Sequence, residues 1–117
     1  MVDGANVVGS RPDGWWKDRA GAARRLHERL MLAAPGYDDV VLVLEGAAKG
    51  GVPAGRDAHV RTVHARGHGD DEIVAQTRAA IDRGDRVAVV SADRALQARV
   101  AHLGATTLSP GWLLDQL

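Results

Sequence analysis

Acidic residues lie where strand-like apolar runs of this chain end or where helices begin. Asp3 lies in MVDGANVV, Asp70 and Asp71 lie in GHGDDEIV, and Asp93 lies in VAVVSADR. Because the strands of an open α/β sheet end at one edge, where ligands bind in the crevice, we expect these carboxylates to converge. Convergent carboxylate oxygens are typical ligands of Mg²⁺ or Mn²⁺. The pattern therefore predicts metal-dependent phosphodiester chemistry.

Each of these acids also has a purely structural interpretation. Asp-Gly is common in turns, which would explain Asp3. An Asp at a helix start binds free N–H groups, which would explain Asp93 and one of Asp70 and Asp71. Three unrelated caps would often include Ser, Thr or Asn, so three Asp junctions favour a shared site. Glu45, which ends VLVLEGAA, either reaches the same edge or points into solvent.

Two further polar residues adjoin these acids. Asn6 follows Asp3 at a distance that could return its amide to the same crevice. Arg94 adjoins Asp93 and would either bind phosphate or neutralise the carboxylate. His68 is close enough to Asp70 to be a general-base candidate, but the histidine spacing fits no zinc motif and the chain has no cysteine.

Alternating Val-rich runs and helical patterns must position these side chains. Strands are predicted at Val2 with Asn6–Val8, at 40–44, 60–63 and 87–90, with a fifth at 106–108. Helices are predicted at 16–33, 71–82, 93–102 and 110–117, the last capped by Ser109 with Pro110 in first position. The Gly-rich stretch 46–57 is expected to be a mobile loop. This alternation predicts an α/β fold with a parallel sheet.

Composition limits the class of protein. A chain of 117 residues is expected to form one domain, 1–117, that can stand alone. The absence of cysteine excludes disulfides, thiolate metal sites and cysteine nucleophiles. No apolar run approaches a membrane span, and the first residues lack the features of a signal peptide, so we expect a cytoplasmic protein.

The basic residues suggest contact with nucleic acid. The net charge is zero, yet 13 of the 15 basic residues are Arg, which offers a bidentate fork for phosphate. Codon bias explains this Arg content equally well. The segment 11–29 holds six cations against three acids, and its candidate RNA contacts are Arg11, Lys17, Arg19 and Arg24. Trp15 is left open as a base-stacking residue, whereas Trp16 is expected in the core.

With these positions assembled, the chain resembles a PIN-like nuclease of the NYN branch, of the small bacterial YacP-like type. The resemblance rests on VDGANVV, GDDEIV and VAVVSADR, followed by GA and a terminal WLLDQL, in the family's order. It implies a three-layer α/β/α sandwich with a central, mainly parallel sheet of four to five strands. It also implies cleavage of RNA with Mg²⁺ or Mn²⁺.

The resemblance also assigns roles to residues. It implies that Asp3, Asp93 and either Asp71 or Asp70 coordinate the metal, and that all four belong to the catalytic set. Glu45, which falls where family members often carry an acid, is the fourth candidate metal ligand. Asn6 and Ser91 match polar positions of the family motifs, whereas the helical Glu of many PIN domains has no clear counterpart.

Three functions remain open from the sequence. The first is a Mg²⁺- or Mn²⁺-dependent ribonuclease acting through the Asp cluster. The second is a non-catalytic RNA-binding or regulatory module with the same fold. The third is a nucleotide or phosphate-ester hydrolase that uses the same acidic edge. Pairing with a second copy or with another protein is left open too.

Overall fold

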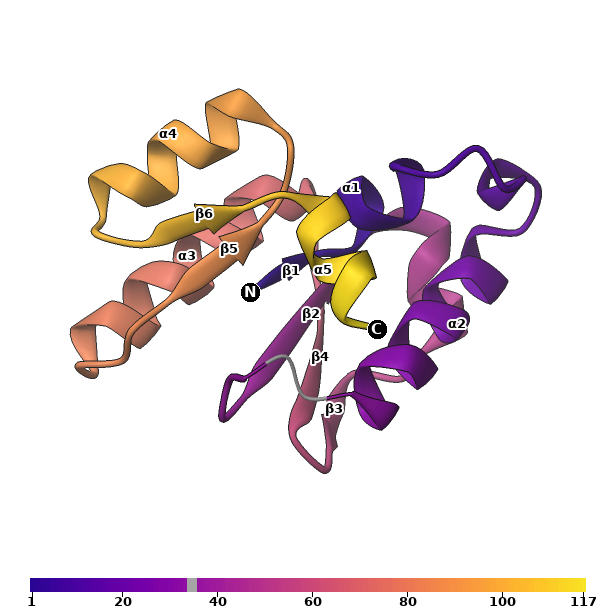
Figure 1. Ribbon diagram of the computed structural model, residues 1–117, viewed down its shortest axis with the longest axis horizontal. Coiled ribbons are helices and arrows are strands. Elements are labelled where there is room, and N and C mark those ends of the chain that lie inside the picture. Colours follow the sequence, from indigo (N-terminus) through magenta and orange to yellow (C-terminus); the bar gives the residue numbers. More distant parts are fainter. Residues whose placement is uncertain (34–35) are drawn as a thin grey trace.

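A mainly parallel sheet forms the centre of the computed structural model, which describes residues 1–33 and 36–117 (Figure 1). Within these residues, six strands lie in the order β3–β4–β2–β1–β5–β6. All neighbouring strands pair in parallel except β3, which is antiparallel to β4. The strands are β1 (Val2–Asp3), β2 (Val40–Leu44), β3 (Gly55–Asp57), β4 (Val60–His64), β5 (Ala88–Val90) and β6 (Thr106–Leu108).

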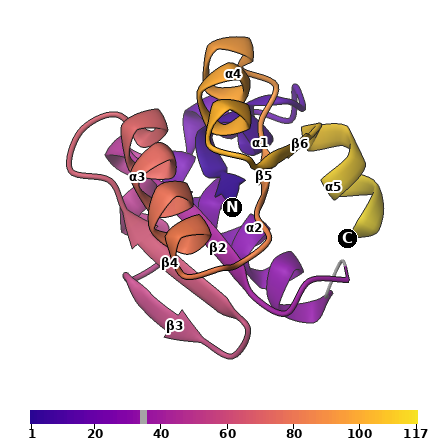
Figure 2. The same cartoon turned by 90° about the vertical axis from the view of Figure 1, so that its left-hand side faces the viewer.

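Helices cover both faces of the sheet, and Figure 2 shows α3 on one side and α5 on the other. Side chains alternate along a strand, so Leu42 of β2 packs into the core beneath α2 whereas Val43 packs into the core beneath α3. One face carries α1 (Gly4–Gly9), α2 (Arg19–Leu32) and α5 (Pro110–Gln116), and the other carries α3 (Gly69–Asp82) and α4 (Arg94–His102). The predicted α/β class with a mainly parallel sheet is confirmed.

The parallel strands end at one edge of this sheet. Asp3 ends β1, and Glu45 and Ser91 directly follow β2 and β5. Because β1 pairs with β2 on one side and β5 on the other, these three residues lie in a row. We call this edge the carboxyl edge and the opposite one, where β1, β2 and β5 begin, the amino edge.

The predicted first strand is wrong beyond Asp3. Asn6, Val7 and Val8 belong to α1 rather than to a strand. The chain turns there because the Asp3 carboxylate accepts a hydrogen bond from the Asn6 backbone N–H (3.3 Å) and so caps the helix. Val7 then packs its fully buried side chain onto the sheet as part of one helical turn.

The predicted mobile loop 46–57 is also wrong, because the segment is structured. It contains the 3₁₀ helix η2 (Gly46–Gly51) and β3, the strand that raises the count above the predicted four to five. Gly55 (φ 134°) and Ala58 (φ 52°) adopt backbone angles that few L-residues favour, and they shape the β3–β4 hairpin. Such pairing at the edge of a sheet leaves little trace in composition.

Helix boundaries follow local capping. The predicted helix 16–33 divides into the 3₁₀ helix η1 (Trp15–Lys17) and α2, because the Asp18 carboxylate accepts from the Gly21 N–H (2.9 Å). The predicted cap of α5 is confirmed, since the Ser109 hydroxyl accepts from the Trp112 N–H (3.0 Å). Within the described ranges, none of the helices is long and apolar enough to cross a membrane.

Candidate functional site

Asp3 stands at the centre of the carboxyl edge, between the ends of β2 and β5. The backbone turns away from the sheet at Gly4, directly after it. A Cβ at Gly4 would lie 2.7 Å from the Val43 carbonyl oxygen and 2.8 Å from the Leu44 side chain. Only glycine therefore lets α1 start this close to β2, and this close approach fixes where the half-buried Asp3 carboxylate points.

A hydrogen-bond network joins Asp3 to the segment after β5. The buried Ser91 hydroxyl donates to Asp3 Oδ2 (2.9 Å) and accepts from the Asp93 N–H (3.1 Å). Asn6 Oδ1 accepts from the Ala92 N–H (2.8 Å). Two of the three supporting polar residues predicted from the sequence therefore lie at this edge: Ser91 orients the carboxylate, and Asn6 ties the start of α1 to the segment after β5.

Glu45 lies beside Asp3 at the end of β2 and meets the start of α3. Its Oε2 accepts from the Gly69 N–H at 2.8 Å, and a Cβ at Gly69 would lie 3.2 Å from the Glu45 carboxyl carbon. His68, the residue before α3, makes no side-chain capping bond. A carboxylate from β2 therefore caps α3, and the prediction that Asp70 or Asp71 is the N-cap is wrong.

Two other carboxylates lie close enough to Asp3 for their charges to act on it. Burial is the main reason that the pKa of Asp3 is raised above its usual value, and the charges of Glu45 and Asp70 raise it further. Hydrogen bonds from Ser91 and from the Asn6 N–H partly offset this effect. We name Asp3, Glu45 and Asp70 the acidic triplet; it joins the ends of two neighbouring strands to the first turn of α3.

The other two predicted acids have different neighbours. The Asp71 carboxylate accepts from Arg99 of α4 at 3.1 Å, in an exposed pair on the outside of the molecule. Asp93 Oδ1 accepts from the Leu96 N–H (3.1 Å) and caps α4. Neither charge contributes to the raised pKa of Asp3. This geometry favours Asp70 over Asp71 as the α3 member of the site.

The arrangement of the acidic side chains limits how a divalent cation could bind. Across residues 1–33 and 36–117, no group of three or more His, Asp or Glu side chains is arranged to hold a metal ion. The acidic triplet does offer only carboxylate oxygens, the ligands that Mg²⁺ and Mn²⁺ prefer. Mg²⁺ commonly uses one or two protein carboxylates and completes its shell with water and substrate phosphate. In donor chemistry, the triplet fits such an ion.

The two tryptophans of η1 differ in exposure, and Trp16 does not take the core position that the sequence predicted. Trp16 is not in the core, because 53% of its surface is exposed. Trp15 is half-buried, with its ring nearly perpendicular to that of Trp16 (centroids 6.0 Å apart) and beneath the Arg19 guanidinium (5.5 Å). The available stacking surface in this segment is therefore Trp16, and the sequence missed it because burial depends on which way η1 faces the sheet.

The predicted cationic contacts Arg11, Lys17, Arg19 and Arg24 are all exposed. Arg11 comes within 4.0 Å of Asp115. Since α2 carries the chain from the carboxyl edge back to the start of β2, Lys17 and Arg19 lie at the end of α2 nearest the acidic triplet. Arg94 is exposed at the start of α4.

One supporting residue was not foreseen. The Gln97 side-chain amide donates to the Ser91 carbonyl oxygen at 2.7 Å and so holds the segment after β5 in place. A lone Gln inside a helical pattern carries no sequence signal for such a role. Two histidines are similarly structural: His59 and His64 contact backbone carbonyls of Leu30 and Val52 at 2.8 and 2.7 Å.

Comparisons with known proteins bear on the fold. No protein-family model and no curated protein matches the sequence. Among solved structures, a mutant of Rae1 (YacP) from Bacillus subtilis is similar, with a TM-score of 0.65 and 19% sequence identity. The match covers 97% of this chain and 70% of that chain. This chain therefore has a YacP-like α/β fold, as its motifs predicted.

Proposed function

We propose that the chain is a Mg²⁺- or Mn²⁺-dependent ribonuclease whose active site is the acidic triplet at the carboxyl edge. The observation that carries the proposal is that Asp3, held by Ser91 at the end of β1, lies beside Glu45 at the end of the neighbouring strand, with Asp70 in the first turn of α3. Burial above all, and then the charges of Glu45 and Asp70, raise the pKa of Asp3 there. Carboxylates that repel one another at a strand-end crevice are a costly arrangement unless a cation or a catalytic task uses them. The YacP-like fold and the motifs of a PIN-like nuclease support the same assignment.

The residues of the site would have two roles in such a reaction, binding the cation and orienting the carboxylates that bind it. Asp3 with one of its neighbours, Glu45 or Asp70, would hold the cation, which would lower the pKa of an attacking water and offset charge on the phosphate. Ser91 and the Asn6 N–H keep the Asp3 carboxylate in one orientation, and the Gly69 N–H does the same for Glu45. A scissile phosphate is positioned precisely only if the carboxylates around it are held in one orientation, as these hydrogen bonds would hold Asp3 and Glu45.

RNA is the proposed substrate because exposed cations and an aromatic ring flank this edge. Lys17 and Arg19 lie at the nearer end of α2, and Trp16 exposes half of its surface beside them. Cationic side chains bind the phosphate backbone, and an exposed indole can stack on an unpaired base. A single-stranded oligoribonucleotide running from this segment to the acidic triplet would use both.

Paired variants test the proposal. An end-labelled oligoribonucleotide is incubated with Mn²⁺, and cleavage is compared for Asp70→Asn and for its chain neighbour Asp71→Asn. We expect Asp3→Asn and Asp70→Asn to lower the rate roughly 100-fold, whereas Asp71→Asn changes it little because that carboxylate pairs with Arg99. Full activity of Asp3→Asn, or of the wild type in EDTA, would contradict the proposal.

A non-catalytic RNA-binding module is the second candidate. It is favoured by the lack of any three-ligand metal group among the described residues. Such a module would bind the same oligoribonucleotide in EDTA with an affinity that falls as salt rises, and would leave it intact when Mn²⁺ is added. Intact RNA together with retained binding would therefore select this alternative.

A further inference from the structure

A cavity of about 590 Å³ opens at the amino edge, at the opposite end of the strands from the acidic triplet. Its volume lies within the range of roughly 300–1,000 Å³ that is typical of small-molecule sites. Buried apolar side chains from three strands and α5 form its floor: Val2, Val40, Val90 and Leu113. Charged and aromatic residues line the remainder, so the cavity has the mixed character of a binding site rather than that of a packing defect.

Guanidinium groups outnumber carboxylates around this cavity. Four Arg side chains line it against three Asp side chains, giving a net positive charge: Arg56, Arg61, Arg83 and Arg86 against Asp38, Asp39 and Asp85. They come from β3, β4, the end of α3 and the segments before β2 and β5. The amino edge thus has the opposite electrostatic character to the carboxyl edge.

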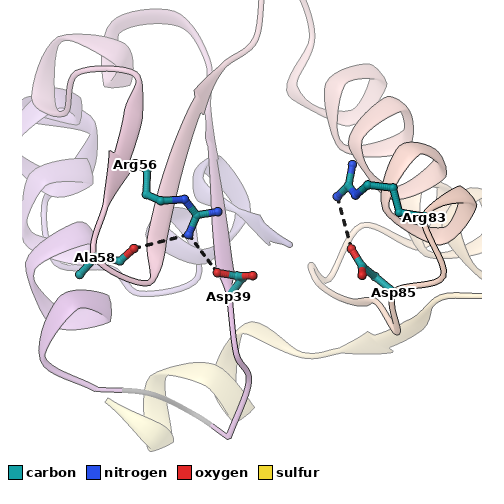
Figure 3. A network of polar contacts seen from close by, with 5 residues as sticks. All are labelled: Asp39, Arg56, Ala58, Arg83 and Asp85. Atoms are coloured by element: carbon teal, nitrogen blue, oxygen red, sulfur yellow. Dashed lines mark hydrogen bonds and ion pairs between the residues drawn. The ribbon is translucent and has the colours of Figure 1, made fainter.

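The arginines retain donors for a ligand. Figure 3 shows two ion pairs on separate elements, Arg56 with Asp39 (2.9 Å) and Arg83 with Asp85 (3.3 Å). All four side chains are more than half exposed, and exposed pairs of this kind contribute little to stability. Arg86 forms no ion pair within the described ranges. A phosphate group, which accepts bidentate Arg contacts, can therefore bind here at little cost to the fold.

An aromatic side chain stands beside these donors. Tyr37 lines the cavity with 42% of its surface exposed. Its ring meets Trp112 of α5 edge to face, with centroids 6.4 Å apart and planes at 83°. That contact fixes the orientation of the tyrosine and leaves surface for a flat, polarisable ligand group to stack on.

We propose that this amino-edge cavity binds a nucleotide, with the base against Tyr37 and the phosphate on Arg83 and Arg86. An apolar floor, one aromatic wall and a cationic rim match the parts of a phosphorylated nucleoside better than those of an aliphatic anion or a neutral metabolite. The nucleotide is either free or the phosphorylated end of an oligonucleotide. This site is separate from the proposed active site and does not depend on its activity.

Calorimetric titration with AMP, adenosine and inorganic phosphate tests the two halves of the site. AMP is expected to bind saturably, and each fragment to bind at least roughly tenfold more weakly because it uses only one half. Arg86→Gln should weaken AMP binding roughly tenfold. The matched control is Arg78→Gln, an exposed α3 arginine that does not line the cavity, and it should bind as the wild type does.

Further arms identify the contacts and the source of the nucleotide. Tyr37→Ala should weaken AMP and leave the affinity for phosphate unchanged. Circular dichroism checks that the variants fold, and Arg86→Gln breaks no ion pair of the described residues, so a folding defect is not expected there. A 5′-phosphorylated oligonucleotide and its unphosphorylated form are compared as competitors of AMP in EDTA. Competition by the phosphorylated form alone would identify the end of a strand as the source of the nucleotide. AMP binding without such competition would identify a free nucleotide.

Three results would overturn the assignment: no AMP binding by the folded wild type, equal losses in Arg86→Gln and Arg78→Gln, or loss of AMP binding in Asp3→Asn. The last would place the nucleotide at the carboxyl edge instead. Loss of RNA cleavage in Asp3→Asn with AMP binding intact would leave this proposal standing. The two proposals can therefore fail separately.

Discussion

Replacing Asp3 by Asn should make the protein more stable at pH 8. The pKa of Asp3 is raised in the folded protein even after its hydrogen bonds are counted, so ionisation of this carboxyl group opposes folding. Asn keeps the shape and is as good an N-cap as Asp. The Ser91 hydroxyl, which now donates to Asp3, can accept from the new amide. The variant therefore removes the charge and keeps a hydrogen bond between positions 3 and 91, with its direction reversed.

The sign of the pH dependence follows from linkage. Because the folded pKa of Asp3 is higher than its usual value of 3.8, the folded state holds the proton more tightly than the unfolded state. The stability that this proton contributes is complete below pH 3.8 and is lost as pH rises through the folded pKa. Each unit of raised pKa is worth about 1.4 kcal/mol. Since Asp3 still contacts solvent, screening makes the gain smaller than this conversion alone gives.

Urea unfolding in EDTA at pH 4 and pH 8 measures this effect. The advantage of Asp3→Asn should be largest at pH 8 and shrink toward pH 4, whereas the exposed control Asp82→Asn should show no comparable change. A gain of 1 kcal/mol corresponds to a rise of about 4 °C in the melting temperature for a chain of this size. If Asp3→Asn is less stable than the wild type at pH 8, or if its advantage does not depend on pH, the electrostatic reasoning is wrong.

Three further predictions concern the same edge. Ser91→Ala should lower stability by roughly 1 kcal/mol and raise the pKa of Asp3 further, because a hydrogen bond that favours the ionised form is removed; chemical unfolding and carboxyl NMR titration measure both. Gly69→Ala should displace Glu45, whose carboxyl carbon would lie 3.2 Å from the new Cβ, and lower cleavage, whereas Gly67→Ala meets nothing within 4 Å and should leave it unchanged. Mn²⁺ at 100 times its Kd should raise wild-type stability by about 2.7 kcal/mol and have little effect on Asp3→Asn; an equal rise in both proteins would place the ion elsewhere.

The sequence predicted correctly those strands and helix ends that depend only on neighbouring residues. The run Val40–Leu44 forms the strand that its continuous apolar character indicates, since both of its faces are covered. Ser109 and Pro110 begin α5 as their types predict, because a cap depends only on the adjacent turn. The Val-Val pair after Asn6 shows the limit of such local patterns. One turn of helix and a short strand share this pattern, and the predicted strand is a helix.

Long-range contacts bear on what the sequence left ambiguous. The choice between Asp70 and Asp71 depends on where α3 begins, and a carboxylate from β2 sets that start by binding the Gly69 N–H. A partner 24 residues away in the chain leaves no local signal. The sequence left open whether Glu45 reaches the same edge as Asp3 or points into solvent, because the answer depends on whether their strands pair, and only the strand order establishes that pairing.

The strand order also has a consequence for biosynthesis. β1 lies between β2 and β5, and the Ser91 hydroxyl that orients Asp3 is 88 residues further along the chain. A ribosome-bound chain that has not yet released β5 therefore cannot complete the carboxyl edge. If this edge cleaves RNA, the unfinished polypeptide should be inert toward the message and ribosome beside it. Fragments that end before β5 can be tested directly for cleavage, and activity in them would show that the late strand is dispensable.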